Sequence, residues 1–311
     1  MPHLYEALSL CDILTEKTMR ILIIFLFSPL YFFGQITIQG KIINAKNKAI
    51  IPFATIGLVK ENIGTNADEE GSFSLTSKAN KVNDTLIISC VGFITQKLLK
   101  DGKNNTSLII ELTEKETILN EIVVKNKINR KTETLNEFSK CGNSFITSSG
   151  FQTQLAQHFQ VKEENSILTE IRICRMGIGL LDPEKTIFRI RIYGIDTLTK
   201  SPSTDLCDQI IEVKTRSKII NLNLEKYKIH ISSKDFFVAI EWLKIPFNES
   251  KSKMKVNGNE VENITYRPGI GWTDNVNSKM EAWMLDYKNG WRPMFKMNNK
   301  TSVSISATVK Y

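Results

Sequence analysis

The chain of 311 residues has few of the residues on which most enzymes and metal sites depend. It has three histidines and five cysteines, and no two cysteines stand at the CxxC spacing of a redox or zinc site. It has no GxSxG motif, no glycine-rich phosphate loop and no run of carboxylates at metal-ligand spacing. The sequence therefore predicts a protein without catalytic residues, without a bound metal and without a cofactor.

Long hydrophobic runs are also lacking, with one exception near the N-terminus. Residues 21–33 are mostly apolar, follow the basic Arg20 and precede the small Gly34, a pattern typical of a secretory signal peptide. The run is too short to span a bilayer comfortably. We predict that residues 1–34 are a mis-assigned start followed by this leader, and that the mature protein is exported to the periplasm or the cell surface. An uncleaved leader is the alternative, and it would be the one contact of the chain with a membrane.

The formal net charge of +8 comes mainly from lysines scattered along the chain. Domains that bind nucleic acid gather their basic residues on one face or helix. Scattered lysines indicate a solvated surface instead, so we expect no nucleic-acid partner. After the leader roughly 275 residues remain, enough for one large or two ordinary domains. We predict two.

Residues 35–125 consist of short segments that are rich in β-branched and aromatic residues and separated by turn residues. The expected strands are 36–43, 53–59, 71–77, 85–93, 107–112 and 121–124. This pattern predicts a small antiparallel β-sandwich. In the fourth segment Leu86, Ile88 and Cys90 share one face, so we expect Cys90 to be buried rather than bridged.

Six blocks of residues occur in a recognisable order within this first domain. They are Gly40, then Pro52–Ile56, Gly64-Thr65 with Asp68, Gly71–Leu75, Val91–Phe93, and Leu119–Val124 as a closing strand. The order resembles the carboxypeptidase-regulatory-like domain, which implies a prealbumin-like seven-stranded β-sandwich. That family occurs beside zinc carboxypeptidases and in envelope proteins of Bacteroidetes. A zinc peptidase is not expected here, because neither His158 nor His230 has a glutamate three positions later.

Residues 126–140 are polar and charged, and they predict a linker or a short helix. Residues 141–311 return to alternation at period two, with Asn-Gly and other turn residues between segments. The expected strands are 167–174, 186–195, 209–214, 218–224, 234–243, 279–287 and 301–311. We predict a second antiparallel β-sandwich, a jelly roll, and expect fragments 35–125 and 141–311 to fold separately. If a disulfide forms, we expect it between Cys174 and Cys207.

One candidate binding surface lies in the segment 186–195. Arg189, Arg191 and Tyr193 share one face of this strand, opposite its apolar residues. Together with Arg172 on a strand expected to lie next to it, they would form a basic, aromatic surface for acidic glycan or phosphate groups. The alternative interpretation is the solvated outer face of a sandwich.

The other candidate surface is aromatic and lies near the C-terminus. It comprises Trp272, Trp283, Tyr287 and Trp291, with Asp274 among the nearby acids. Aromatic faces stack on sugar rings while neighbouring carboxylates accept hydrogen bonds from hydroxyls, so the group predicts a glycan-binding surface. Trp291 follows a turn and is expected to be the most exposed. Core packing is the alternative, and it explains Trp283 well.

These observations predict an exported, non-catalytic envelope protein that acts as a binding or adaptor module for a glycan or an envelope protein. Two other functions stay open. One is a glycan-active jelly-roll enzyme, for which Glu241 is a candidate buried acid that lacks an evident second carboxylate. The other is a structural subunit of an envelope assembly that pairs through an open sheet edge.

Overall fold

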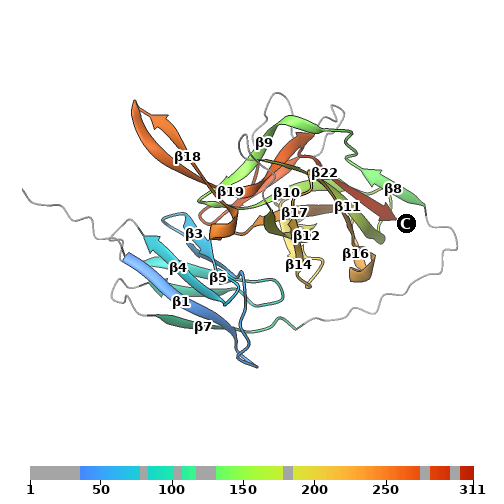
Figure 1. The fold of residues 1–311 in the computed structure, drawn as a ribbon. Helices are drawn as coiled ribbons and strands as arrows, with labels where there is room; N and C mark the ends of the chain where they lie inside the picture. The colour runs from blue at the N-terminus through green and yellow to red at the C-terminus, as the bar shows by residue number, and fades with distance from the viewer. Residues whose placement is uncertain are drawn as a thin grey trace, which may run out of the picture.

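The computed structural model describes residues 36–77, 83–100, 107–116, 131–177, 185–273, 281–294 and 302–311. In these ranges the regular structure is β-strand, apart from two short 3-10 helices, η1 (Glu225–Tyr227) and η2 (Pro246–Asn248). Neither described helix is long and apolar enough to cross a membrane. The predicted all-β class is confirmed, and Figure 1 shows two β domains side by side. The predicted leader lies outside the described residues.

The first domain is a sandwich of seven described strands, as the resemblance implies. One sheet has the order β4-β1-β7 and the other β3-β2-β5-β6. The strands are β1 (Ile36–Asn44), β2 (Thr55–Leu58), β3 (Ile63–Asn66), β4 (Ser72–Ser77), β5 (Asp84–Ser89), β6 (Gln96–Lys100) and β7 (Leu108–Leu112). The sequence predicted a purely antiparallel sandwich. β1 and β7 run parallel, so the first domain is instead a mixed sandwich. Cys90 is buried beside Leu86 and Ile88 in the core, as expected.

The second domain is a larger sandwich in which every recorded strand pair is antiparallel. Its seven-stranded sheet has the order β13-β12-β17-β10-β20-β21, with β14 also paired to β12. These strands are β10 (Gln152–Gln160), β12 (Thr186–Ile195), β13 (Pro202–Asp205), β14 (Ile211–Thr215), β17 (Asp235–Trp242), β20 (Ala282–Asp286) and β21 (Gly290–Pro293). The predicted second antiparallel sandwich is confirmed.

The opposing sheet of the second domain has eight strands in the order β18-β19-β11-β22-β8, with β15 and β16 on β11 and β9 on β19. They are β8 (Thr132–Leu135), β9 (Cys141–Ser149), β11 (Ser166–Met176), β15 (Ile219–Asn223), β16 (Ile229–Ile231), β18 (Glu249–Val256), β19 (Asn259–Thr273) and β22 (Ile305–Lys310). β8 falls within the predicted linker 126–140 but pairs with β22. This part of the segment therefore belongs to the second domain.

The main core lies between these two sheets. On β12 the side chains of Phe188, Ile190 and Ile192 point inward and are almost fully buried, as the alternation predicted. Each such side chain contributes roughly 1.5 to 3 kcal/mol by leaving water. Trp242 and Trp272 are the largest members of the same core.

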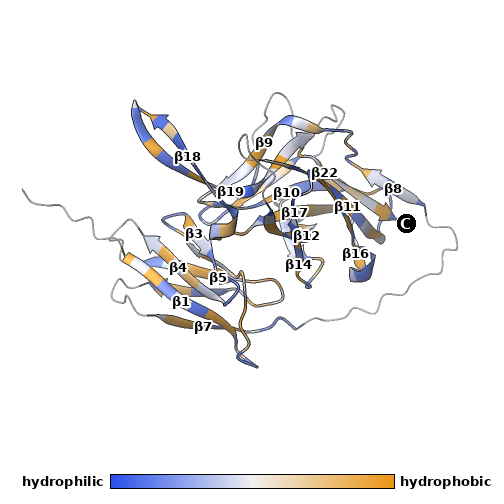
Figure 2. Cartoon of the chain, in the orientation of Figure 1, coloured by the Kyte–Doolittle hydropathy of each residue, from blue (hydrophilic) through white to orange (hydrophobic). Residues whose placement is uncertain are grey.

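A two-stranded arm, residues 249–264 of β18 and β19, extends away from the body (Figure 1). Its turn has Asn257 and Gly258 at positive φ, as an Asn-Gly hairpin requires. Figure 2 shows hydrophobic and hydrophilic residues alternating along it. Sequence patterning missed these strands because polar residues outnumber apolar ones in the arm: lysine and serine in β18, and asparagine and glutamate in residues 259–264 of β19.

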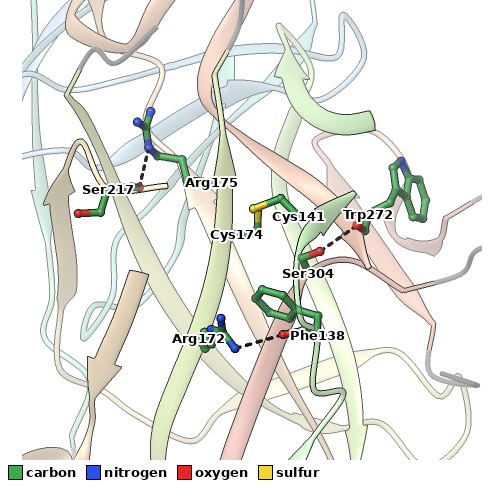
Figure 3. Close-up of a disulfide and its surroundings, with 8 residues drawn as sticks. All are labelled: Phe138, Cys141, Arg172, Cys174, Arg175, Ser217, Trp272 and Ser304. Atoms are coloured by element: carbon green, nitrogen blue, oxygen red, sulfur yellow. Dashed lines mark hydrogen bonds between the residues drawn. A yellow bond between two sulfur atoms is a disulfide. The ribbon is translucent and has the colours of Figure 1, made fainter. Parts of the chain in front are cut away.

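The disulfide joins Cys141 to Cys174 (Figure 3), and the expected pairing of Cys174 with Cys207 is wrong. β9, which begins at Cys141, pairs with β19, and β19 in turn pairs with β11 next to Cys174. The two Cα atoms are 5.6 Å apart, which suits a disulfide. Cys207 follows β13 at the edge of the opposing sheet and is free and buried, as is Cys90.

Candidate functional site

The candidate site lies on the outer face of the seven-stranded sheet, the face turned away from the main core. Cross-strand pairing places side chains on this face in rows. One row contains Arg189, Glu241, Gln154, Leu285 and Trp291. The next contains Arg191, Ala239, Ala156 and Trp283, and the third contains Tyr193, Phe237 and His158. The predicted shared face of Arg189, Arg191 and Tyr193 is confirmed.

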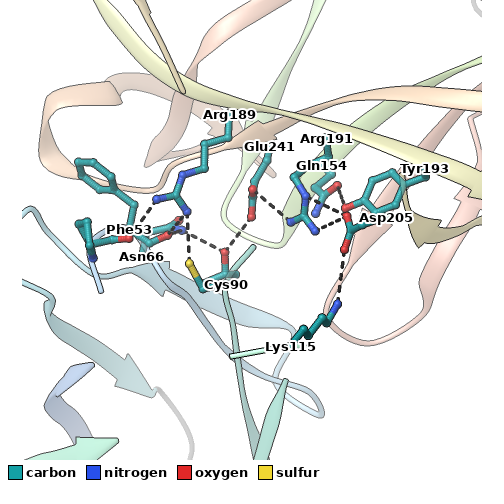
Figure 4. Close-up of polar contacts among 12 residues, drawn as sticks. Phe53, Asn66, Cys90, Lys115, Gln154, Arg189, Arg191, Tyr193, Asp205 and Glu241 are labelled. Atoms are coloured by element: carbon teal, nitrogen blue, oxygen red, sulfur yellow. Dashed lines mark hydrogen bonds and ion pairs between the residues drawn. The ribbon is translucent and has the colours of Figure 1, made fainter. Parts of the chain in front are cut away.

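The first domain covers one end of this face, so the two arginines are not solvated. Arg189 is 1% exposed. Its guanidinium donates hydrogen bonds to the carbonyl oxygen of Phe53 at 3.1 Å and to that of Pro52 at 3.0 Å (Figure 4). Phe53 has a φ of 56°, a left-handed conformation that a phenylalanine rarely adopts. The turn that presents these carbonyls is therefore a strained one, held in place by its contacts.

A chain of charged groups crosses the same boundary. Arg191 donates to Asp205 at 2.6 Å and lies 3.5 Å from the Glu241 carboxylate. Glu241 accepts a hydrogen bond from Thr55 of the first domain at 3.2 Å, and Asp205 lies 3.6 Å from Lys115 of the first domain. The chain thus begins and ends on the first domain (Figure 4). We call this end of the outer face the docked end.

Two glycines of the first domain make room for an aromatic ring of the second. A Cβ atom at Gly57 or Gly64 would overlap the ring of Tyr287. The side chain of Asn66, on β3, accepts a hydrogen bond from the backbone N–H of Lys244 at 2.8 Å. The pairing of a flat glycine surface with a tyrosine ring lets the β2–β3 hairpin lie directly against the second domain.

Apolar contacts complete the docked end. Phe53 is buried in a cluster with Ile187, Leu243 and Ile245 of the second domain. Its ring also lies 5.5 Å from the Arg189 guanidinium, within the range of a cation–π contact. Hydrophobic burial, buried hydrogen bonds and ion pairs therefore act together to fix the first domain on this sheet.

The other end of the outer face is aromatic, and we call it the aromatic end. It is a cluster of Ala156, Tyr193, Phe237, Ala239 and Trp283, against which Ile195 and Trp291 pack. Phe237 and Trp283 have their ring centroids 6.2 Å apart. His158 lies 5.0 Å from the ring of Phe237 and 2.9 Å from the Asp235 carboxylate.

The contact between Tyr193 and Trp291 shows that this face is curled. Their strands, β12 and β21, are separated by three others, so their rings would lie about 19 Å apart in a flat sheet. The centroids are 5.7 Å apart, edge to face. The two rings therefore meet across a concave sheet, and Ala156 and Ala239 on its floor are fully buried.

The structure divides the predicted aromatic group among three places. Trp283 and Trp291 lie at the aromatic end, and Trp291 is partly exposed there. Trp272 is 1% exposed and belongs to the main core. Tyr287 lies in the contact with the first domain, and Asp274 lies outside the described residues.

Tyr193, predicted with the arginines, joins the tryptophans instead. Its hydroxyl donates to Gln154 at 2.9 Å, and the Arg191 guanidinium lies 5.3 Å from its ring. Arg172 does not contribute to this surface, because β11 lies in the opposing sheet, where Arg172 donates to the Phe138 carbonyl (Figure 3). Strand alternation assigns faces, but it does not identify neighbouring strands.

Several residues of the site were missed from sequence. Phe53, Asn66 and Lys244 act across the domain boundary, and Phe237 and His158 complete the aromatic end. Gly57 and Gly64 were the available signal, since a glycine within a strand often marks the close approach of another group.

Burial shifts the pKa values of several groups in the site. It raises the pKa of Tyr193 and of Tyr287 well above the usual value for tyrosine, and it raises that of the Cys90 thiol. Burial lowers the pKa of Lys244 to about 7. The tyrosines therefore stay neutral donors, and the Cys90 thiol is a poor nucleophile while it is covered.

The described residues include no group of three or more His, Cys, Asp or Glu that could hold a metal ion. Glu241, the candidate buried acid, is 5% exposed, and its two oxygens contact Thr55 and Arg191. These contacts use both oxygens of the Glu241 carboxylate to hold the two domains and β12 together. Trp291 is partly exposed and packs against the rings of the aromatic end.

Comparison with known proteins places the first domain in a family. Among curated proteins, none matches the chain. Two solved structures that show similarity are the cysteine protease and lectin-like domains of Cwp84, a surface layer associated protein of Clostridium difficile, and the clostridial Cwp84 protease after propeptide cleavage.

The first is 11% identical with a TM-score of 0.34 and covers 83% of this chain; the second is 12% identical with a TM-score of 0.35 and covers 89%. This chain spans 58% and 66% of their lengths. The family model of the CarboxypepD_reg-like domain matches residues 38–124. With its seven-stranded sandwich, the first domain of this chain is a carboxypeptidase-regulatory-like domain.

Proposed function

We propose that this chain is an exported, non-catalytic binding module of the cell envelope that binds glycan at the aromatic end of its outer face. The observation that carries the proposal is the partly exposed Trp291, whose ring meets Tyr193 edge to face at 5.7 Å over a concave, aromatic-lined sheet. Sugar rings stack on aromatic faces held in this manner. The carboxypeptidase-regulatory-like domain is the fixed neighbour of this surface.

Two features support export. Residues 21–33 have the pattern of a secretory leader. The disulfide between Cys141 and Cys174 joins strands of the second domain, and such bonds persist in oxidising compartments. Sequencing the N-terminus of the protein recovered from the cell envelope tests this part: the mature chain should begin within a few residues of Gln35, whereas recovery of intact Met1 would contradict cleavage.

A glycan array screened with the wild type and with Trp291→Ala tests binding. Loss of one stacking ring costs on the order of 1 kcal/mol, so binding should weaken several-fold while the melting temperature changes little. Phe247→Ala is the matched control, because Phe247 is an exposed aromatic residue outside the cluster, and it should bind like the wild type. If the wild type binds no glycan, or if Trp291→Ala unfolds the protein, the proposal fails.

The arm favours a second candidate function, that of a subunit in an envelope assembly. Met254, Val256 and Val261 are 46%, 43% and 39% exposed on one side of a hairpin that extends from the body. Apolar side chains gathered in this way often mark a contact with another protein. Replacing all three by threonine should abolish co-purification with an envelope partner while leaving glycan binding unchanged; co-purification that survives the change would exclude the arm as the contact.

An enzymatic function receives less support from the geometry. A glycosidase needs a second carboxylate that faces the first across the bound sugar. Glu241 is instead held by Arg191 and Thr55 beneath the first domain. The pairing explains why a buried glutamate is tolerated on this strand.

A further inference from the structure

Lys244 lies at the centre of the contact between the two domains. It follows β17 and is 3% exposed. Its backbone N–H donates to the Asn66 side chain at 2.8 Å, and its carbonyl accepts a hydrogen bond from Thr65 at 3.5 Å. Both partners belong to β3 of the first domain. Lys244 therefore cannot change its position without disturbing the docked end.

The amine of Lys244 has polar neighbours but no counter-ion. It donates to the Gly150 carbonyl in the β9–β10 turn and to the Tyr287 hydroxyl at 3.4 Å, and it lies 4.5 Å from the Tyr287 ring. In the described part of the chain, no carboxylate forms an ion pair with it. Burial in the absence of a counter-ion lowers the pKa of this amine to about 7.

The charged group near this amine has other partners, and the remaining titratable groups around it are tyrosines. Glu241, on β17, is paired with Arg191 and bonded to Thr55. Tyr287 faces the amine from the β20–β21 turn, and Tyr266 on β19 is near enough to influence Tyr287. The β2–β3 hairpin contributes Gly64, Thr65 and Asn66, which carry no charge. Among the described elements that pack here, none supplies a carboxylate paired with this amine.

We propose that Lys244 makes the docking of the first domain sensitive to pH, so that a proton on its amine loosens the contact and releases the first domain from the outer face. A charged, unpaired amine buried at an interface is costly, whereas the same amine in water is solvated. Release would uncover Arg189, Arg191 and Glu241 next to the aromatic end. The proposal concerns the regulation of this face and holds whatever ligand the aromatic end binds.

The direction of the effect follows from proton binding. An amine in water has a pKa near 10.4, whereas that of docked Lys244 is about 7. Between these values the undocked state binds more protons, so lowering the pH favours undocking. The effect levels off below about pH 7, where both states are protonated.

Labelling of Cys90 with a thiol reagent measures undocking. Cys90 is buried and its sulfur lies 3.8 Å from the Arg189 guanidinium, so the first domain must move away before the thiol reacts. A background of Cys207→Ala leaves Cys90 as the one free thiol described. The reaction of a thiol with the reagent itself depends on pH, because the thiolate is the reactive form. This dependence is the same in every variant. The labelling rate of each variant is therefore divided by the labelling rate of Lys244→Met at the same pH.

The wild-type rate relative to Lys244→Met should rise about tenfold or more between pH 8.5 and pH 6. Lys115→Met is the matched control, because Lys115 also contacts the second domain but through a half-exposed amine; its pH profile should follow the wild type. A wild-type ratio that stays constant over this range would overturn the proposal.

A permanently charged side chain gives a second test should Lys244→Met fail to fold. Cys90 should be labelled quickly in Lys244→Arg at both pH values, because the arginine stays charged. The labelling rate of Lys244→Arg divided by that of the wild type should fall as the pH is lowered, because the wild type then becomes charged as well. Equal labelling of Lys244→Arg and the wild type at pH 8.5 would contradict the proposal. Circular dichroism on each variant verifies that labelling reports undocking of a folded protein.

Discussion

The two ends of the outer face differ although they are built on the same strands. At the docked end, Arg189 and Glu241 are buried because the first domain covers them and supplies hydrogen-bond partners for both. At the aromatic end, Phe237 and Trp283 are buried by each other and by Trp291 from the far edge of the curled sheet. One end is closed by a separate domain, and the other is closed only by its own side chains.

This difference explains why we propose the aromatic end, rather than the docked end, as the binding surface. Opening the docked end exposes charged groups and breaks bonds to the first domain, which carries a large cost. At the aromatic end a partly exposed ring already faces solvent, so a ligand needs to displace little. Substitutions at the docked end should therefore cost more stability the more deeply buried the contact that they remove.

The largest effect is expected from Arg189→Ala. The change removes the donor to the Pro52 carbonyl and one of the two donors to the Phe53 carbonyl, which keeps its hydrogen bond from Asn66. Together with the lost packing of the guanidinium on Phe53, this should lower the free energy of unfolding by about 3 kcal/mol. Chemical unfolding measures it. Arg292→Ala is the control, because Arg292 is half exposed and pairs with Asp286 outside the interface. If the two variants are equally stable, Arg189 does not hold the docked end.

The next effect is expected from Gly57→Ala, since the added methyl group overlaps the Tyr287 ring. Overpacking of this kind costs roughly 1 to 3 kcal/mol. The loss should largely disappear when Tyr287→Ala is also present, which a double-mutant cycle measures. Gly194→Ala, where the nearest atom is 3.6 Å from the added Cβ, is the control and should cost less.

A third prediction concerns pH. Because the pKa of Lys244 is about 7 in the folded protein and near 10.4 in the unfolded chain, the unfolded state binds more protons between these values. The free energy of unfolding relative to Lys244→Met should therefore rise by about 1 kcal/mol from pH 7 to pH 8. Parallel profiles for the two proteins, from urea titrations at each pH, would show that Lys244 is charged when folded.

The smallest effect is expected from Lys115→Ala. Its amine is 3.6 Å from Asp205 and its side chain is 49% exposed, so the pair contributes less than about 1 kcal/mol. The difference from the wild type should vanish in 1 M salt. A loss comparable to that of Arg189→Ala would mean that the charged chain, rather than the buried arginine, holds the domains together.

The sequence predicted the framework of the fold well. Alternation located β12 at its correct residues, and it assigned Arg189 and Phe188 to opposite faces. It also identified the first domain, where glycines and apolar residues occur in a specific order. It missed the arm, because polar residues outnumber apolar ones there and its two strands pair mainly with each other rather than with the core sheets.

The site was less predictable, because alternation shows which side chains share a face but not what covers that face. From the sequence, an outward-pointing Arg189 could be solvated or could be buried under another part of the chain. The structure shows the second case, with Arg189 bonded to the carbonyl of Phe53, 136 positions earlier in the chain. Tyr193 and Trp291 meet only because the sheet curls, a property of the whole sheet. The separate folding of fragments 35–125 and 141–311 stays a prediction, and the second fragment would lack β8.

The central claim is that the first domain is docked on the outer face as part of one unit, and unfolding followed by two probes tests it most directly. All four tryptophans, Trp242, Trp272, Trp283 and Trp291, lie in the second domain, so their fluorescence reports on that domain alone. Labelling of Cys90 reports on the first domain, because its thiol is covered only while that domain is folded and docked. The two probes should give coincident denaturation midpoints in the wild type and separate midpoints in Arg189→Ala. Separate midpoints in the wild type would contradict the account.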